Sequence, residues 1–279
     1  MTNDIKGMSE IPVWLPFQRS IASQIDLTSR LGRNYRIFVA VPSVPPPPGG
    51  FPVLYLLDGN ASFATAMDAA AVQMRRPGGS GLSPGIVVGI GYPREAPFDM
   101  ERRSFDYLAS GTSTNPAFKF GGAAQFADFI ETELKPMIES TWPVDRTRQA
   151  LFGHSFGGLF VLWSLFTRPE AFQAHIAASP SIWWDSRAIL KNADAYEQRK
   201  QVPSAKARLL ITVGGLERDI PFPGGKLDMV ADAEALATRL RAKAEGAVDV
   251  SYAAIADESH MSVIPSAISR GVRFGWQGY

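Results

Sequence analysis

Six short apolar runs, spread over most of the chain, constrain its fold more than any other feature. They are PVLYLLDG (52–59), PGIVVGIG (84–91), QALFG (149–153), AHIAAS (174–179), RLLITVGG (208–215) and DVSYAAI (249–255). A continuous apolar run of this length is typical of a strand that is buried on both faces. Such strands belong to parallel sheets with helices on both sides, so the runs predict an α/β fold.

Helical patterns lie between these runs, as the crossovers of a parallel sheet require. Residues 122–140 repeat apolar side chains at spacings of three and four, which predicts an amphipathic helix. A second helix is predicted directly after residue 155, and a third over residues 229–244, which are rich in Ala, Leu, Arg and Glu. The alternation predicts a doubly wound, mostly parallel sheet. No linker is visible, so residues 1–279 are predicted to form one domain.

Three segments fall outside this alternation. Residues 20–42 suit two strands joined by a hairpin turn at RLGRN (30–34). Residues 44–50, VPPPPGG, predict a stiff loop, because proline neither donates to a strand ladder nor fits inside a helix. Residues 92–121 are turn-rich, and we expect a long irregular loop with a functional role there.

The composition excludes several kinds of function. The net charge is +1 and the pI is about 8.0, which gives no sign of a nucleic-acid partner or of binding to a charged membrane surface. Cysteine is absent, so disulfides, a thiolate nucleophile and thiolate metal ligands are excluded. The apolar runs are too short to span a membrane, and the N-terminal MTNDIKGMSE lacks the apolar core of a signal peptide. We therefore expect a cytoplasmic protein; its oligomeric state is not indicated.

Residues 153–157, GHSFG, fit G-x-S-x-G, the sequence of a nucleophile elbow. They follow the apolar Ala-Leu-Phe and open a helix, which is the strand–turn–helix context that the motif requires. The turn holds a serine Oγ above the sheet, at a helix N-terminus, and needs glycine where strand and helix approach closely. We therefore predict that Ser155 is a nucleophile. The alternative is a glycine-rich turn with a capping serine.

A nucleophilic serine needs a base within hydrogen-bond reach, and the chain has three histidines. His154 lies inside the turn, where its side chain is expected to point away from the serine Oγ. His175 lies in a predicted core strand, where internal packing or hydrogen bonding is favoured. His260 follows the last predicted strand, at the strand end where α/β sheets place their chemistry, and is therefore the predicted base.

The third member of such a site is a carboxylate that orients the imidazole and stabilises its charged form. In α/β-hydrolases the chain order is serine, acid, histidine. The acid then belongs to the loop after residues 208–215, whose sequence LERD offers Glu217 and Asp219. We favour Glu217, while Asp219, Asp185 and a dyad without an acid remain as alternatives.

Acyl transfer also needs two backbone N–H groups that bind the developing oxyanion. One is expected from Phe156, the residue after the nucleophile, and the other from the loop after the early strand at 52–59. Asn60, directly after Asp58-Gly59, is the predicted second donor, although Asp-Gly-Asn is also an ordinary turn sequence.

These residues together resemble one branch of the α/β-hydrolase superfamily, which holds esterase D-like enzymes, feruloyl esterases, mycolyl transferases and siderophore trilactone esterases. The resemblance covers nearly the whole chain and is nearest to the siderophore esterases, on VLYLLDGNASF (53–63), RRSFDYL (102–108), FGHSFGGLF (152–160) and ASPSIWWD (178–185). It implies an α/β-hydrolase fold, with Ser155 and His260 as nucleophile and base. That group often has Thr-Pro after the DY pair, where this chain has LAS (108–110), in a loop near the expected substrate pocket.

Three side chains in these stretches are candidates for substrate binding. Trp183 and Trp184 suit stacking on catechol rings or other aromatic acyl groups, or else are core aromatics. Arg103 suits an anionic ferric tricatecholate, because a guanidinium is always charged and binds pairs of oxygen atoms. The alternative for Arg103 is an internal ion pair with Asp106.

The sequence thus predicts a serine esterase that works through an acyl-enzyme and requires neither a cofactor nor a metal. Its predicted partner is a small-molecule ester. A trilactone siderophore is the most specific candidate substrate, and a general carboxylesterase or a feruloyl- or acetyl-type esterase on small acyl esters is the alternative. An acyltransferase would have the same residues. A non-catalytic ligand-binding protein of the same fold is a third class.

Overall fold

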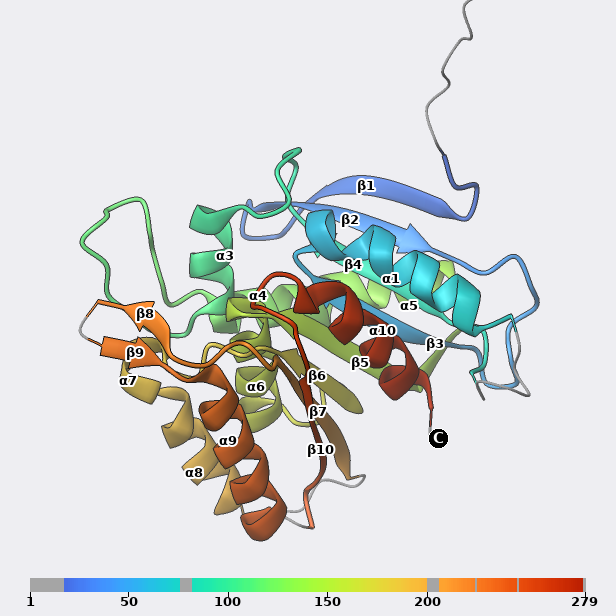
Figure 1. The fold of residues 1–279 in the computed structure, drawn as a ribbon. Helices are drawn as coiled ribbons and strands as arrows, with labels where there is room; N and C mark the ends of the chain where they lie inside the picture. The colour runs from blue at the N-terminus through green and yellow to red at the C-terminus, as the bar shows by residue number, and fades with distance from the viewer. Residues whose placement is uncertain (1–17, 76–81, 200–205, 224, 245, 278–279) are drawn as a thin grey trace, which may run out of the picture.

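The computed structural model describes residues 18–75, 82–199, 206–223, 225–244 and 246–277. Its centre is an eight-stranded sheet with the strand order β1-β2-β4-β3-β5-β6-β7-β10 (Figure 1). The strands are β1 (Ala22–Thr28), β2 (Asn34–Ala40), β3 (Phe51–Leu57), β4 (Ile86–Gly91), β5 (Val144–His154), β6 (Ala174–Ala178), β7 (Ala207–Gly214) and β10 (Val248–Ile255). Strand β2 is antiparallel to β1 and to β4, and the other neighbouring pairs are parallel.

The central strands are buried on both faces, as their apolar runs predict. Every residue of β3 is buried, and alternate side chains enter different clusters. Val53 and Tyr55 belong to the cluster on one face of the sheet, and Leu54 and Leu56 belong to the cluster on the other face. The sheet is therefore the middle layer of three.

Helices form the two outer layers (Figure 1). One face is covered by α1 (Gly59–Gln73) and α10 (Val263–Trp276), which also pack on each other. The other face holds α3 (Met100–Tyr107), α4 (Ala123–Phe129), η1 (Ile130–Leu134), α5 (Lys135–Thr141), α6 (Phe156–Thr167), α8 (Ile189–Glu197) and α9 (Met229–Lys243). This confirms the predicted doubly wound, mostly parallel α/β sheet.

Most of the predicted elements are present, with two differences. The helix expected over 122–140 contains a π-helical turn, η1, between α4 and α5. The expectation of an irregular loop over 92–121 is wrong in part, because this segment contains α3. Asp99 caps α3 by accepting a hydrogen bond from the backbone N–H of Arg102 at 3.1 Å.

Two predictions are not tested by these elements. The N-terminal segment used for the signal-peptide argument lies outside the described residues. That the chain is one domain stays a prediction, although the strands of the sheet come from both halves of the chain, from Ala22 to Ile255.

One edge of the sheet collects the segments that build the site. The carboxyl ends of neighbouring parallel strands lie at the same edge, which is where α/β folds place their ligands. A short helical segment, α7 (Trp184–Arg187), follows β6 there, and a small hairpin of β8 (Ile220–Phe222) and β9 (Gly225–Leu227) follows β7 (Figure 1).

Candidate active site

Ser155 occupies the sharp turn between β5 and α6. Its backbone has φ 60° and ψ −116°, a conformation that residues other than glycine rarely adopt. Two neighbouring glycines make the turn possible. A Cβ on Gly153 would lie 2.3 Å from the carbonyl oxygen of Gly157, and one on Gly158 would lie 2.7 Å from that of Ala178. The structure thus has the strand–turn–helix that the motif predicts.

The side chains of Ser155, His260 and Glu217 form a continuous chain of hydrogen bonds. His260 Nε2 lies 3.0 Å from Ser155 Oγ, and His260 Nδ1 lies 2.7 Å from Glu217 Oε2. The Glu217 side chain is 1% exposed, whereas that of His260 is 32% exposed, so a substrate can reach the imidazole but not the carboxylate. With Nδ1–H donating to Glu217, Nε2 of the neutral ring accepts the serine proton.

The Glu217 carboxylate has two further donors on its other oxygen. Glu217 Oε1 accepts a hydrogen bond from the backbone N–H of Gly214 at 2.8 Å and another from the hydroxyl of Ser179 at 2.5 Å. Ser179 directly follows β6, is fully buried, and has a left-handed φ of 41°. These contacts fix the carboxylate in one orientation towards the imidazole.

The other carboxylates considered from the sequence have different partners. Asp219 is exposed and pairs with Lys226 at 3.3 Å. Asp185 is exposed and accepts a hydrogen bond from the hydroxyl of Ser110. The structure therefore brings Glu217, and neither of these, to His260.

The two remaining histidines are buried and neutral. His154 Nε2 lies 2.8 Å from the backbone oxygen of His260, whereas the imidazole nitrogen that contacts Ser155 Oγ is Nε2 of His260. Burial, with a smaller contribution from the charges of His260 and Arg103, lowers the pKa of His154 to about 3. Burial likewise lowers the pKa of His175 to about 3, and within the described residues neither of its ring nitrogens has a hydrogen-bond partner.

Phe156 and Asn60 each lie in the first turn of a helix, where backbone N–H groups have no intrahelical acceptor. Helices α6 and α1 start at the same edge of the sheet, because they follow the neighbouring parallel strands β5 and β3. Asn60 Oδ1 accepts from the N–H of Tyr92 at 2.9 Å, and Asn60 Nδ2 donates to the carbonyls of Tyr92 at 3.0 Å and Arg94 at 2.7 Å. The Asn60 side chain thus fixes its turn, and oxyanion binding by its backbone N–H stays a prediction.

Arg103 is only 4% exposed and lies beside the serine turn. Its Nε and Nη2 donate to the two carboxylate oxygens of Asp58, each at 3.0 Å, and Nη2 also lies 3.3 Å from the carbonyl oxygen of His154. Burial alone would lower the pKa of Arg103, but the Asp58 charge more than offsets this and raises it. The predicted internal partner was wrong, because Asp106 is bound instead by Arg33 at 3.2 Å.

Trp183 and Trp184 are half-buried in an aromatic cluster next to the nucleophile. The ring centroids of Trp184 and Phe156 are 4.9 Å apart, and those of Trp183 and Trp184 are 5.7 Å apart. Phe222, on the β8–β9 hairpin, adds a ring 4.9 Å from that of Trp183 and is 41% exposed. Sequence reasoning missed Phe222 because the hairpin strands are three residues long and show no apolar alternation.

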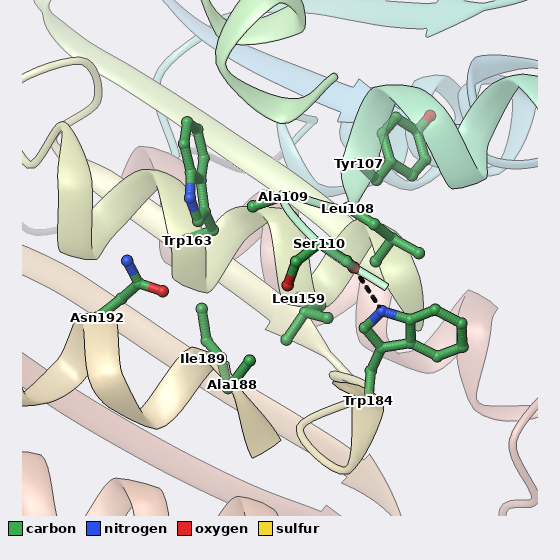
Figure 2. Close-up of a pocket in the computed structure, with 10 residues that line it drawn as sticks. All are labelled: Tyr107, Leu108, Ala109, Ser110, Leu159, Trp163, Trp184, Ala188, Ile189 and Asn192. Carbon is green, nitrogen blue, oxygen red and sulfur yellow. Dashed lines mark hydrogen bonds between the residues drawn. The ribbon is translucent and has the colours of Figure 1, made fainter. Parts of the chain in front are cut away.

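A pocket lies beside Trp184 (Figure 2). Its lining residues are Tyr107, Leu108, Ala109, Ser110, Leu159, Trp163, Trp184, Ala188, Ile189 and Asn192. The indole Nε1 of Trp184 donates to the carbonyl of Ser110 at 2.9 Å, the dashed line in Figure 2. The LAS segment, where this chain departs from the siderophore esterase pattern, thus forms part of a pocket wall next to the aromatic cluster.

Metal-binding clusters and membrane-spanning helices are both absent from the described part of the chain. No group of three or more His, Cys, Asp or Glu side chains in this part of the chain is placed so that it could hold a metal ion. None of the helices that the structure describes is both long enough and apolar enough to cross a membrane.

The strained serine after β5, with a histidine and a buried carboxylate after later strands of the same sheet, defines an α/β-hydrolase of the serine-hydrolase class. The sequence model of the family described as "Putative esterase" matches residues 28–261, which is most of the chain. The chain therefore belongs to this esterase family.

Individual relatives agree with this assignment. The ferri-bacillibactin esterase BesA of Bacillus subtilis is 40% identical over 249 residues, which cover 87% of this chain and 84% of that protein. A siderophore triacetylfusarinine C esterase of Aspergillus fumigatus is 39% identical over 242 residues, with 80% and 81% covered. The crystal structure of the BES protein from Bacillus cereus aligns with a TM-score of 0.87 at 36% identity, covering 97% of this chain and 100% of that chain. The chain is thus a serine hydrolase that acts on ester bonds.

Proposed function

We propose that this esterase works through an acyl-enzyme, with Ser155 as nucleophile, His260 as base and Glu217 as its acid partner. The observation that supports this is the hydrogen-bonded chain, 3.0 Å from Ser155 to His260 and 2.7 Å from His260 to Glu217. Ser155 Oγ attacks the ester carbonyl carbon while His260 Nε2 takes its proton, which then passes to the departing alcohol. Water, deprotonated by the same nitrogen, attacks the acyl carbon, and the acid leaves as Ser155 regains its proton.

The negative oxygen of each tetrahedral intermediate is bound, in this proposal, by the backbone N–H groups of Phe156 and Asn60. One such donor typically contributes about 3 kcal/mol to transition-state stabilisation. Arg103 adds positive charge beside the serine turn, and its guanidinium lies 5.5 Å from the Phe156 ring centroid. Nε and Nη2 are on Asp58, and Nη1 lies 3.8 Å from Sδ of Met100, so all three nitrogens of the guanidinium have partners within the protein, and its contact with substrate oxygen stays a prediction.

We propose a trilactone siderophore with aromatic arms as the substrate, hydrolysed in the cytoplasm. Two relatives named as siderophore esterases support the substrate class. The cluster of Phe156, Trp183, Trp184 and Phe222 supports aromatic arms, because flat rings stack favourably on such side chains. The LAS segment beside this cluster favours the alternative, a general carboxylesterase for small acyl esters.

The test compares kcat/KM for a tricatecholate trilactone, with and without ferric iron, with that for p-nitrophenyl butyrate, and uses Ser155→Ala as the blank. A preference of about a hundredfold for the trilactone, which corresponds to about 2.7 kcal/mol in transition-state binding, is the expected result. A preference for the small ester would agree with the esterase mechanism but would contradict the proposal that a siderophore is the substrate. Hydrolysis that persists in Ser155→Ala would overturn the mechanism itself.

A further inference from the structure

His154 has a contact that the catalytic chemistry does not use. It is the first of the two variable residues of the G-x-S-x-G turn, directly before the nucleophile, and it is 5% exposed. Its Nε2 lies 2.8 Å from the backbone oxygen of His260, and the two imidazole rings are 4.6 Å apart between centroids. One residue thus connects the turn that holds the nucleophile to the loop that holds the base, although 106 positions separate the two histidines.

The direction of this hydrogen bond follows from its acceptor. A carbonyl oxygen only accepts, so His154 Nε2 must carry a proton and donate it. The charged groups that face the ring are Arg103 and His260, which, like burial, disfavour a second proton on the imidazole. His154 is therefore a neutral donor at neutral pH.

The bond from His154 acts on a loop whose other side faces solvent. Ser259, Met261 and Ser262 on either side of His260 are exposed, and loops of this kind move more than the elements that they join. Glu217 holds the imidazole through Nδ1, and the backbone before His260 is held at Glu258, whose carbonyl accepts from the N–H of Leu216 at 3.0 Å, and at Ser259, whose N–H donates to Ser262 Oγ at 2.9 Å. The bond from His154 holds the backbone of His260 itself from the buried side. Displacement of a catalytic group by about 1 Å can cost about a hundredfold in rate.

We propose that His154 is a positioning residue, whose Nε2–H holds the backbone carbonyl of His260 and thereby keeps the His260 imidazole within hydrogen-bond distance of Ser155. This inference rests on the proposed function of Ser155 and His260. It assigns a chemical requirement to a motif position that G-x-S-x-G itself leaves open: a buried, neutral N–H donor of about the length of histidine.

The chain offers a matched control in His175. Its ring is also buried and neutral, on the neighbouring strand β6, and in the described part of the chain its nitrogens have no hydrogen-bond partner. Loss of a buried imidazole at residue 175 therefore reports the cost of altered core packing without a change to the catalytic loop.

The experiment measures kcat and KM for p-nitrophenyl butyrate, and the urea unfolding of each variant. His154→Leu is expected to lower kcat about tenfold or more with little change in KM, whereas His175→Leu keeps kcat within twofold. His154→Gln, whose amide reaches about as far as Nε2, is expected to recover most of the lost rate, and His154→Asn, one methylene shorter, is not. The NMR signal of the His260 Nδ1 proton should shift or broaden in His154→Leu and stay unchanged in His175→Leu.

Wild-type kcat in a folded His154→Leu protein would overturn the inference. If that variant does not fold, equal rates for His154→Gln and His154→Asn would overturn it, because these two are matched in polarity and differ in reach. Labelling of wild-type Ser155 by a fluorophosphonate tests the proposed function separately. Failure to label Ser155 would contradict the proposed function. Labelling of Ser155 together with an unchanged rate in His154→Leu would contradict only the positioning role of His154.

Discussion

The Nδ1 atom of His260 lies 2.7 Å from Oε2 of Glu217, while Oε1 of the same carboxylate accepts two hydrogen bonds, from Ser179 and from the N–H of Gly214. In Glu217→Gln the backbone N–H of Gly214, which can only donate, will select the amide oxygen as its acceptor, so the NH₂ group will face Nδ1. The imidazole must then carry its proton on Nε2, where it cannot accept the proton of Ser155. We expect kcat to fall about a hundredfold or more, measured on p-nitrophenyl butyrate.

Asp219→Asn is the matched control for that substitution, since Asp219 lies on the same loop and is exposed. Its kcat should stay within about twofold of wild type. A Glu217→Gln protein with unchanged kcat would instead mean that Ser155 and His260 act as a dyad. An inactive Asp219→Asn protein would mean that Asp219 is needed for catalysis, which contradicts its use as a control.

The sheet could be predicted from the sequence because strands that are buried on both faces consist of unbroken apolar runs. Helix α3 could not, because the side that it buries includes Arg103, Ser104 and Asp106. Ion pairs and hydrogen bonds replace apolar contacts along that side, so the apolar period that reveals a helix is missing. The helix could be found only through its cap at Asp99.

The arrangement of Ser155, His260 and Glu217 could be predicted because the motif, the small number of histidines and the chain order leave few choices. The residues that support them could not. Ser179 reaches Glu217 across 38 positions, and His154 reaches His260 across 106. Hydrogen bonds between loops so far apart depend on which strand ends are neighbours, and no local pattern records this.

The buried pair of Arg103 and Asp58 gives a prediction about stability. Both side chains are 5% exposed, so removing one leaves the other charge buried without its partner. Arg103→Met is expected to lower the free energy of unfolding by about 3–5 kcal/mol. Adding Asp58→Asn, which removes the stranded charge, should restore part of that loss in urea unfolding. If the double variant is less stable than Arg103→Met, the charge of Asp58 is not the cause of the loss.

The buried histidines make stability depend on pH. The folded pKa of His154 and of His175 is lowered to about 3, below the value of about 6.5 expected in the unfolded chain. Between these values the unfolded chain binds protons that the folded protein does not, so stability is lost as the pH falls through 6.5 towards 3. For one such histidine the loss between pH 7 and pH 5 is about 2 kcal/mol.

His175→Leu isolates one of these contributions. Urea unfolding at pH 7 and pH 5 should show a drop in stability that is smaller than that of wild type by about 2 kcal/mol. The variant's absolute stability does not enter this comparison, because a change in packing affects both pH values alike. An equal pH dependence in the two proteins would show that His175 is protonated in the folded state.

Within the aromatic cluster, Phe222 is expected to affect which ester is preferred and not the chemical step itself. Its ring packs 4.9 Å from that of Trp183 and is 41% exposed, so it can contact a substrate arm without touching the hydrogen-bonded chain of Ser155. An aromatic contact contributes about 0.5–1.5 kcal/mol. Phe222→Ala should therefore lower kcat/KM for the ethyl ester of an aromatic acid up to about tenfold and leave ethyl acetate, which has no ring, within twofold.

Val72→Ala is the control for that substitution, because Val72 is an exposed apolar side chain about 18 Å along α1 from Asn60. Neither ester should be affected by it. If Phe222→Ala lowers kcat/KM equally for both esters, the hairpin supports the catalytic loops, since loss of a ring contact with the substrate can affect only the ester that has a ring. If it changes neither, the aromatic arm lies on the Trp184 side of the cluster, and the β8–β9 hairpin does not contribute to specificity.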